Sequence, residues 1–550
     1  MTATSTSIGP LYQTGRIGLE GLAEELRQLE GELEPIDIAG YHYRHRQSIL
    51  PKYPPRVRVA LMREYLRVSG PARSWPDGNK PGAHCSWANA NRRLWHRDTQ
   101  LESAKLQFAF SENSIRDKAR RSAKKCSRLT QMSRSLPEAY AVCQQYARDE
   151  RVQAPAPKMN SVSMRSSHSR MLCQFWWRRQ LRNVFARLAE GRLRELGFVS
   201  RRAGVYASDE TVNRRLEQKK RKRQMLEGLI AVNDLGESFS LAEISESSNS
   251  NPRIRRCEMM ARLAGIEEYA RANNWKADFY TLTTPSRFHA FFTSGEPNPK
   301  FQDMTPRDSQ EWLTKNWSRI RAKLARENIS AFGVRIAEPH HDGTTHWHLL
   351  LFSRLENRSE VQKIVRRYMF QDCPDEPGAS KHRVKTIPIN YKIGSAIAYV
   401  AKYVSKNIDG VGVGPDHEDY DSASCVENAV RVEAWASTWA IRQFQFFGTP
   451  PMGPWRELRR IRKVLKSNLE RFRCAVDAGK WREYITEMGG VCRKMTEYPV
   501  RLWKRLRDQP GYYGDPPRQE TVGVCFEGAD IQTRDRVWAI VPSALLEFCQ

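Results

Sequence analysis

Two histidines and two tyrosines have the spacing needed to bring them together in one reactive site. His346 and His348 are separated by one residue, and residues i and i+2 of a β-strand project from the same face. Tyr399 and Tyr403 are four residues apart, which puts both phenols on one face of a helix. Imidazoles bind divalent metals and a phenol can act as a nucleophile. The set therefore indicates phosphodiester chemistry on DNA, with tyrosine attacking beside a metal.

A third metal ligand is expected from the strand that pairs with the histidines. FGVRIAE (332–338) and HWHLLLF (346–352) are predicted to form a hairpin, because the turn between them contains Asp-Gly. This hairpin brings Glu338 near the imidazoles. Rival third ligands, or ordinary turn residues, are His340, His341 and Asp342. Carboxylate and water ligands favour Mg²⁺ or Mn²⁺, whereas imidazole widens the choice toward zinc. Without the carboxylate, two histidines at this spacing are more typical of a structural or surface position.

The tyrosines lie on a predicted helix, GSAIAYVAKYVSKN (394–407). Its predicted aliphatic stripe consists of Ile393, Ile397, Val400 and Val404. At 100° per residue the tyrosines lie roughly opposite this stripe, interleaved with Lys402 and Lys406. Because a free phenol has a pKa of about 10, lysine charges and a metal would favour its ionised form. Packing is the alternative role for tyrosines on a helix.

Two tyrosines permit two successive transfers. One would hold the 5′ end of a nicked strand and free a 3′-OH for a polymerase. The other would cut the newly made junction, after which the freed 3′-OH would attack the first link and close a circle. Since each transfer conserves the phosphodiester bond, no external energy is needed for rejoining.

The composition favours a polyanionic partner. The chain has 550 residues, with 90 Lys+Arg against 62 Asp+Glu and a formal net charge of +28. Such a surplus suits DNA, because neutralising phosphates releases counterions. A solvated basic surface is the alternative.

The 11 cysteines include no CxxC pair, and no run of about 18 apolar residues could span a bilayer. We therefore expect a cytoplasmic protein that does not associate with membranes.

The order of predicted elements indicates an α+β fold. From FYTLTT (279–284) to the tyrosine helix the order is β-α-β-β-α-β-α, which suggests a ferredoxin-like antiparallel sheet with helices on one face. A helix over 309–328 carries the stripe Leu313, Trp317, Ile320 and Leu324. The predicted domains are a basic, mostly helical region (1–165), a helical Arg-rich region (166–273), the nuclease core (274–410) and a mostly helical basic region (411–550). TVGVCF and DRVWAIV are strand-like segments near the end.

Three motifs carry a family resemblance. EPHHDGTTHWHLLLF (338–352) and IAYVAKYVSKNIDG (397–410) resemble the second and third motifs of the HUH endonuclease superfamily, and more closely those of the bacteriophage replication gene A protein family of rolling-circle initiators. FYTLTTPSRFHA (279–290) resembles that family's first motif, and the likeness extends over about 170–465. The resemblance implies that His346 and His348 bind the metal and that Tyr399 and Tyr403 are the nucleophiles.

The resemblance also implies partners. It implies nicking of single-stranded or supercoiled origin DNA in the host bacterium, a covalent 5′ link and reliance on a host helicase and polymerase. The sequence contains no GxxxxGK[ST] motif, which agrees with reliance on a helicase from the host. Expected DNA contacts are Thr281, Thr283, Arg287, Lys402 and Lys406. The first-motif strand has an alternative role as the central support of the sheet.

Three other protein classes compete with this reading. A plasmid relaxase and a single-strand transposase share the same nuclease core. A non-enzymatic binder of single-stranded nucleic acid would instead stack bases on its histidines and tyrosines. That binder explains the charge of the chain, but it does not explain the His-x-His pair, the glutamate and the paired tyrosines together.

Overall fold

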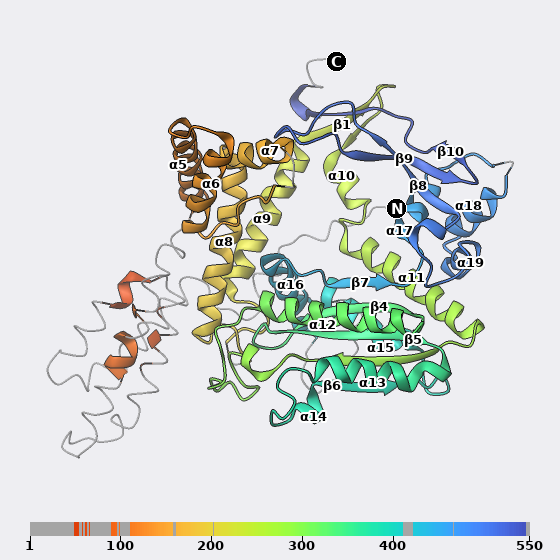
Figure 1. The fold of residues 1–550 in the computed structure, drawn as a ribbon, viewed down its shortest axis with the longest axis horizontal. Coiled ribbons are helices and arrows are strands. Elements are labelled where there is room, and N and C mark those ends of the chain that lie inside the picture. The colour runs from red at the N-terminus through yellow and green to blue at the C-terminus, as the bar shows by residue number, and fades with distance from the viewer. Residues whose placement is uncertain are drawn as a thin grey trace. The chain divides into compact units, whose positions relative to one another are not determined.

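The computed structural model describes residues 49–53, 58, 61–62, 65, 90–95, 98–99, 111–157, 161–201, 203–410, 422–465 and 467–545. The chain divides into two compact units, Met1–Asp117 and Lys118–Gln550. Most of the first unit, and with it much of the predicted N-terminal region (1–165), lies outside the described residues. The candidate site lies wholly in the second unit (Figure 1). The predicted domain boundaries at 165, 273 and 410 remain predictions.

The candidate site is built on a five-stranded antiparallel sheet with the strand order β6-β3-β5-β4-β7. Its strands are β3 (Lys276–Leu282), β4 (Ala331–Pro339), β5 (Thr345–Ser353), β6 (Val384–Pro388) and β7 (Phe444–Phe447). Two three-stranded antiparallel sheets consist of β1 (Leu229–Asn233), β2 (Ser238–Ser240) and β11 (Trp538–Pro542), and of β8 (Val500–Leu506), β9 (Gln519–Phe526) and β10 (Ala529–Gln532). The chain is thus a mixed α and β protein with antiparallel sheets, as the sequence predicted.

Helices make up most of the remaining described chain. Before the large sheet they are α5 (Glu112–Gln131), α6 (Leu136–Asp149), α7 (Ser161–Met171), α8 (Gln174–Glu195), α9 (Asp209–Glu227), α10 (Leu241–Glu246) and α11 (Pro252–Ala272). Within or after it they are α12 (Pro306–Arg326), α13 (Arg358–Met369), α14 (Ala379–His382), α15 (Ala396–Ile408), α16 (Ser422–Trp439), α17 (Met452–Leu458), α18 (Leu469–Asp477) and α19 (Trp481–Glu487). The C-terminal region also holds β7 to β11, so it contains more strand than expected; β9 includes TVGVCF, and β11 includes only the last four residues of DRVWAIV.

Helices cover both faces of the large sheet. All nine residues of β5 are buried. Trp347, Leu349 and Leu351 pack against α12, α13 and α16, whereas Leu350 and Phe352 belong to the core beneath α11 and α15. The expectation of helices on one face was therefore wrong. Its physical reason lies in the consecutive apolar run after the histidines, because a strand that is apolar at every position must be buried on both faces.

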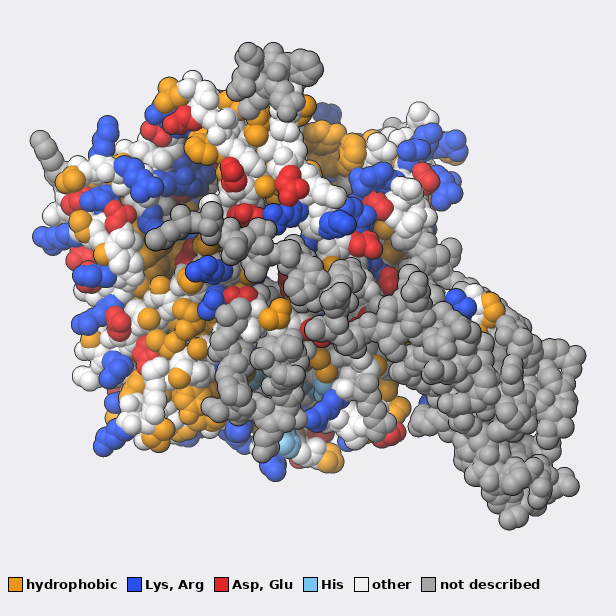
Figure 2. All heavy atoms as spheres, turned by 180° about the vertical axis from the view of Figure 1, so that it is seen from behind, with side chains coloured by type: hydrophobic (Ala, Val, Ile, Leu, Met, Phe, Trp, Pro, Cys, Tyr) orange, Lys and Arg blue, Asp and Glu red, His pale blue; other side chains and the backbone are white. Residues whose placement is uncertain are grey.

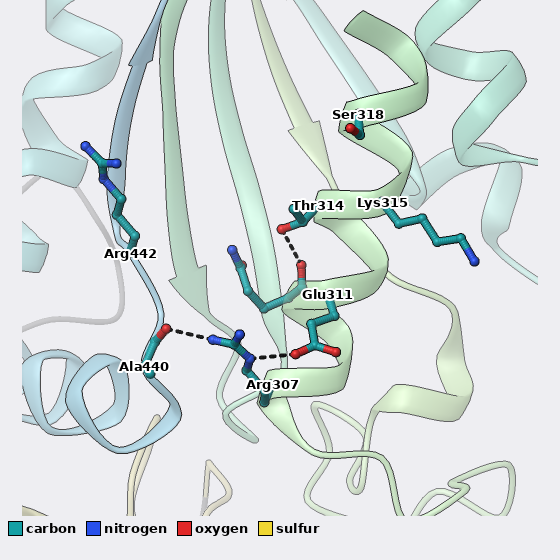
Figure 3. A pocket seen from close by; sticks show the side chains of 8 residues that line it. Arg307, Glu311, Thr314, Lys315, Ser318, Ala440 and Arg442 are labelled. Atoms are coloured by element: carbon teal, nitrogen blue, oxygen red, sulfur yellow. Dashed lines mark hydrogen bonds and ion pairs between the residues drawn. The ribbon is translucent and has the colours of Figure 1, made fainter. Parts of the chain in front are cut away.

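The predicted stripe on α12 is confirmed, and this helix also holds the strand that carries the histidines. Its four stripe residues are all buried in the core on the Trp347 face. Beside the stripe, Gln310 accepts a hydrogen bond from Trp347 Nε1 at 2.9 Å. Gln310 also lines a cavity of about 510 Å³ between α12 and residues 440–442, where Arg307 links Glu311 to the carbonyl of Ala440 (Figure 3).

A glycine in β4 allows the close approach of β5. A Cβ atom added to Gly333 would lie 2.0 Å from the carbonyl oxygen of Leu350. We therefore predict that Gly333→Ala lowers the free energy of unfolding by about 1–3 kcal/mol, the usual cost of overpacking. Gly191→Ala is the matched control, since its Cβ would meet nothing within 4 Å and alanine favours a helix. Urea unfolding of the full chain, followed by tryptophan fluorescence, measures the stability of both variants. Equal unfolding midpoints for Gly333→Ala and Gly191→Ala would contradict the prediction.

Candidate active site

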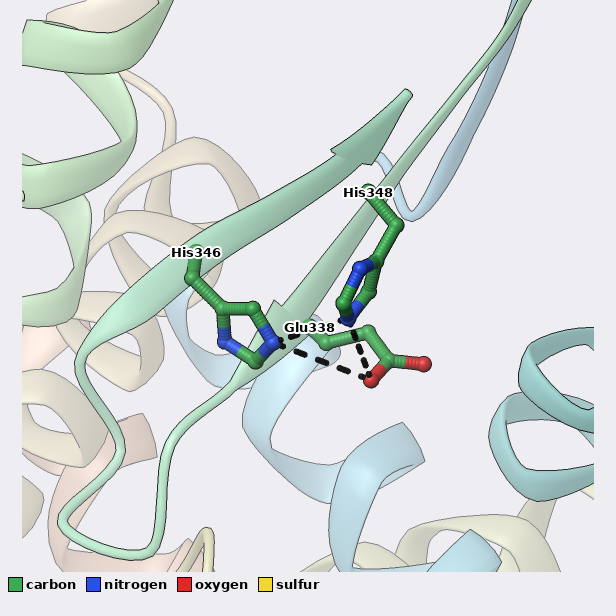
Figure 4. Close-up of side chains that lie close together, drawn as sticks. All are labelled: Glu338, His346 and His348. Atoms are coloured by element: carbon green, nitrogen blue, oxygen red, sulfur yellow. Dashed lines mark hydrogen bonds and ion pairs between the residues drawn. The ribbon is translucent and has the colours of Figure 1, made fainter. Parts of the chain in front are cut away.

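Glu338, His346 and His348 converge at one end of the β4–β5 hairpin (Figure 4). Glu338 lies opposite His346 in the strand register, and all three residues are buried. The Oε2 atom of Glu338 is 3.6 Å from Nε2 of His348 and 4.0 Å from Nε2 of His346, and the two Nε2 atoms are 3.1 Å apart. Donor atoms of all three residues lie within 4.8 Å of one another, so a single cation could touch all of them. Their role as ligands remains a prediction.

The charge state of these residues suits a divalent cation. Burial alone would raise the pKa of Glu338, but the charge of Lys406 and hydrogen bonds from His348 and Asn407 hold it below its ordinary value. Burial, with the neighbouring His340, lowers the pKa of His346 well below its usual range. At neutral pH the site therefore presents a carboxylate and a neutral imidazole, the forms that bind metal. The Nδ1 atom of His346 is buried and has no hydrogen-bond partner among the residues that the structure describes.

Two polar side chains, Thr281 and Asn407, contact the candidate metal ligands His348 and Glu338. Thr281 lies opposite His348 in the β3–β5 register, and its Oγ1 is 3.2 Å from Nδ1 of that histidine. Because Thr281 contacts Nδ1, the Nε2 atom of His348 faces Glu338. A hydrogen bond to the other ring nitrogen commonly orients a metal-binding histidine in this way. Asn407 donates through Nδ2 to Oε1 of Glu338 and to the carbonyl of Tyr403, the latter at 2.6 Å. From the sequence we expected Thr281 to contact DNA, and nothing in the sequence marked Asn407 as a site residue.

The tyrosine helix lies against the same face of the sheet. Helix α15 begins after Ser395, which caps it by accepting a hydrogen bond from the backbone N–H of Ala398. The ring of Tyr403 stacks on His348 with centroids 4.0 Å apart, and on Phe279 at 5.6 Å. Tyr399 lies 5.9 Å from the same Phe279 ring. The structure thus places Tyr403 in direct contact with a candidate ligand, and Tyr399 beside Phe279, whose ring also stacks on His348.

The predicted position of the tyrosines relative to the aliphatic stripe was wrong. Ile393 precedes α15 and is 83% exposed, whereas Ala396 and Asn407 are buried. This shifts the buried face of the helix toward the tyrosines, which pack at the edge of the core instead of opposite it. Within the predicted stripe, Val400 and Val404 are buried and Ile397 packs against the core, so only Ile393 was assigned wrongly.

Charges around Tyr403 act in opposite directions. Burial and the nearby carboxylate of Glu338 raise the pKa of the Tyr403 phenol, while Lys406 opposes them. Lys406 Nζ lies 3.8 Å from Oε2 of Glu338, and Lys402 Nζ lies 4.9 Å from the centre of the Tyr403 ring. Burial therefore keeps the phenol neutral at ordinary pH, and added positive charge nearby would favour its ionisation.

The rival third ligands occupy other positions. The ring of His340 packs on His346 at 4.1 Å, and burial lowers the pKa of His340 to about 3. His341 Nε2 contacts the carbonyls of residues 291 and 292 at 3.2 and 3.1 Å. Asp342 is buried and paired with an arginine. Within the described parts of the chain, Glu338 is the carboxylate that gathers with the two histidines, and the geometry favours it.

A buried arginine from outside the sheet fixes the hairpin turn. Arg194, at the end of α8, donates to the carbonyl of Asp342 at 2.6 Å and to Oγ1 of Thr344 at 2.7 Å. It also donates to the carbonyls of Phe288 and Met304, each at 2.5 Å. One side chain thus joins the hairpin to the loop after β3 and to the segment before α12. Such a hydrogen-bonded charge limits movement of the strand ends that carry the candidate ligands.

Two of the expected DNA contacts have partners within the protein. The hydroxyl of Thr283 donates to the carbonyl of His382 at 2.8 Å. Arg287 forms a two-pronged ion pair with Asp372, at 2.9 and 2.6 Å. Their role in binding DNA remains a prediction.

Among the helices that the structure describes, none is long and apolar enough to cross a membrane.

The comparison with known families defines the class of this protein. The chain belongs to the bacteriophage replication gene A protein (GPA) family, whose sequence model matches residues 100–411. This confirms the family that the three motifs indicated. The chain is 39% identical to the "Replication gene A protein" of Escherichia phage 186 over 395 residues, which cover 69% of this chain and 56% of that protein.

Other relatives carry related names. The chain is 36% identical to a "Probable replication endonuclease from prophage-like region" of Salmonella paratyphi A, covering 64% of this chain and 46% of that protein. It is 36% identical to the "Probable replication protein P12" of Pseudoalteromonas phage PM2, covering 66% and 57% respectively. The chain thus spans about half the length of the curated relatives it matches. No solved structure matches it.

The contact between Thr281 and His348 leads to a prediction about metal affinity. We expect Thr281→Val to weaken Mn²⁺ binding by about 10- to 100-fold, the usual cost of losing a hydrogen bond behind a metal ligand. Thr283→Val is the matched control, because its hydroxyl bonds a distant carbonyl instead. Isothermal titration of the full-length variants with Mn²⁺ measures both. Equal affinities would mean that Thr281 does not orient His348.

Proposed function

We propose that this chain is a phage or prophage replication initiator that nicks one DNA strand at an origin in a metal-dependent reaction, with tyrosine as nucleophile. The observation that carries the proposal is the stacking of Tyr403 on His348, beside the carboxylate of Glu338. Family membership supports it, since several relatives are named replication endonucleases. The net charge of +28 suits a DNA substrate.

The residues of this chain have distinct roles in the proposed reaction. A divalent cation such as Mg²⁺ or Mn²⁺, held by His346, His348 and Glu338, would polarise the scissile phosphate and neutralise its charge. A tyrosine oxygen attacks the phosphorus, a new O–P bond forms, and the bond to the 3′ oxygen breaks. The phenolic proton is lost to solvent, and the 3′ oxygen gains a proton and leaves as a hydroxyl. Lys402 and Lys406 favour the phenolate and hold the DNA phosphates.

The product is a 5′-phosphotyrosine link and a free 3′-OH that primes rolling-circle synthesis. The reverse reaction rejoins the strand, because the phosphotyrosine retains the energy of the diester. Tyr399, one helical turn from Tyr403, provides the second acceptor that successive transfers require. The host bacterium supplies the helicase and the polymerase, since the chain contains no phosphate-binding loop of its own.

In this proposal the five-stranded sheet is a ferredoxin-like HUH nuclease core. The pairing of β4 with β5 and the placement of α15 over β3 support that assignment. A relaxase or transposase would use the same core, but the family membership favours a replication initiator. The non-enzymatic binder is disfavoured by the packing of the rings. His348 is buried and stacks on Tyr403, so little of its ring is available for base stacking.

The tyrosines are tested by trapping the covalent product. Full-length protein is incubated with labelled single-stranded DNA from its own gene and flanking sequence, with Mg²⁺ or Mn²⁺, and run on a denaturing gel. We expect an adduct that maps to Tyr399 or Tyr403, and its complete loss in the double Tyr→Phe variant. Tyr391→Phe is the control, because Tyr391 packs against the same core away from the candidate ligands. Continued nicking by the double variant would refute the proposal, and the single variants rank the two residues.

The metal requirement is tested separately. We expect EDTA to abolish adduct formation, and His348→Ala to abolish it at any concentration of Mg²⁺ or Mn²⁺. Binding of the same DNA, followed by fluorescence anisotropy, should persist in both cases, since phosphate contacts elsewhere do not need the metal. Binding without an adduct in the wild-type protein, across substrates and metals, would favour the non-enzymatic binder. Unchanged cleavage by His348→Ala would remove this residue from the ligand set.

A further inference from the structure

A groove rich in arginine lies on the other side of α11 from the tyrosine helix. Its volume is about 1240 Å³, and its walls come from residues 247–262, 452–462 and 476–481. Figure 1 shows α17, α18 and α19 grouped beside α11, where these segments meet. Arg256 on α11 pairs with Asp409 at the end of α15, at 2.7 Å. A single helix therefore contacts the tyrosine helix and also forms one wall of the groove.

The groove carries much more positive than negative charge. Six arginines line it, namely Arg253, Arg262, Arg456, Arg459, Arg460 and Arg462. Its two carboxylates are already engaged, because Glu258 pairs with Arg456 at 2.6 Å and Asp477 pairs with Arg473 outside the groove. Arg253, Arg459 and Arg462 have no ion-pair partner in the part of the chain that the structure describes. Figure 2 shows Lys and Arg side chains interspersed with acidic and hydrophobic ones over one face of the molecule.

The chemistry of the lining favours phosphate over bases. The aromatic residues of the groove, Trp455 and Trp481, are buried, so no exposed ring is available for base stacking. Among the described residues, none accepts a hydrogen bond from the buried indole N–H of Trp481. Arg253 lies in the first turn of α11, where the helix dipole adds partial positive charge. Guanidinium groups bind phosphate oxygens with two parallel hydrogen bonds and read no sequence.

We infer that this groove binds the sugar–phosphate backbone of DNA independently of sequence, through Arg253, Arg459 and Arg462. This inference deepens the proposed function, because the groove would hold a DNA backbone one helix away from the helix that carries the tyrosines. It assigns a second DNA-binding site, separate from the candidate metal ligands. The partner is the phosphate chain of a DNA strand, either single or in a duplex.

The test compares two triple variants of the full-length protein. One changes Arg253, Arg459 and Arg462 to Gln. The other changes Arg321, Arg326 and Arg367 to Gln, which removes the same charge from exposed positions on α12 and α13. Binding of mixed-sequence DNA, single-stranded and duplex, is measured by fluorescence anisotropy at several salt concentrations. EDTA is present throughout, so that the result does not depend on nicking.

We expect the groove variant alone to lose affinity and salt dependence. Each phosphate contact contributes about 0.7 to the slope of log K against log salt on single strands and about 0.9 on duplex, so losing three lowers it by about 2 to 3. The DNA form with the larger loss is the form that the groove holds. Equal losses in both triple variants, or none in the groove variant, would overturn the inference. Failure of the proposed function is distinct, because it appears as an absent covalent adduct while binding is intact.

Discussion

The site depends on an ionised carboxylate buried between two imidazoles. A charge removed from water is costly unless nearby groups compensate it, so the surroundings of Glu338 are tightly constrained. Lys406 supplies positive charge, Asn407 supplies a hydrogen bond, and the donor set leaves room for a divalent cation. Both compensating residues lie on α15, which also carries the tyrosines. The interaction that satisfies the carboxylate therefore also holds the tyrosine helix on the sheet.

Much of the site could be predicted because it rests on local periodicity. The Asp-Gly turn fixes the hairpin, and the hairpin register then places Glu338 opposite His346. The spacing of four residues places both tyrosines on one side of α15, and the stripe of α12 marks its buried face. These features depend on residues close together in the sequence. The three motifs also identified the family, which the comparison confirms.

What could not be predicted depends on contacts between distant segments. Thr281 faces His348 only because β3 pairs with β5, and a threonine near a motif gives no sign of this contact. Asn407 bonds Glu338 across 69 positions of the sequence. The apolar run after His348 is consistent with burial on both faces, but periodicity does not say which helices cover each one. After β7 the chain forms α17, α18 and α19 before the consecutive strands β8 to β11, and only two of these strands gave a signal in the sequence.

The contact of Arg194 with the hairpin turn has a consequence for recombination between related genes. Arg194 and Asp342 are 148 positions apart, yet one guanidinium ties together the turn, the loop after β3 and the approach to α12. A recombination event with a crossover between α8 and β3 would combine the arginine of one parent with the acceptors of another. Hybrids that keep these partners matched retain the anchored turn. Inheritance of the five-stranded sheet is thereby linked to a helix that lies outside it.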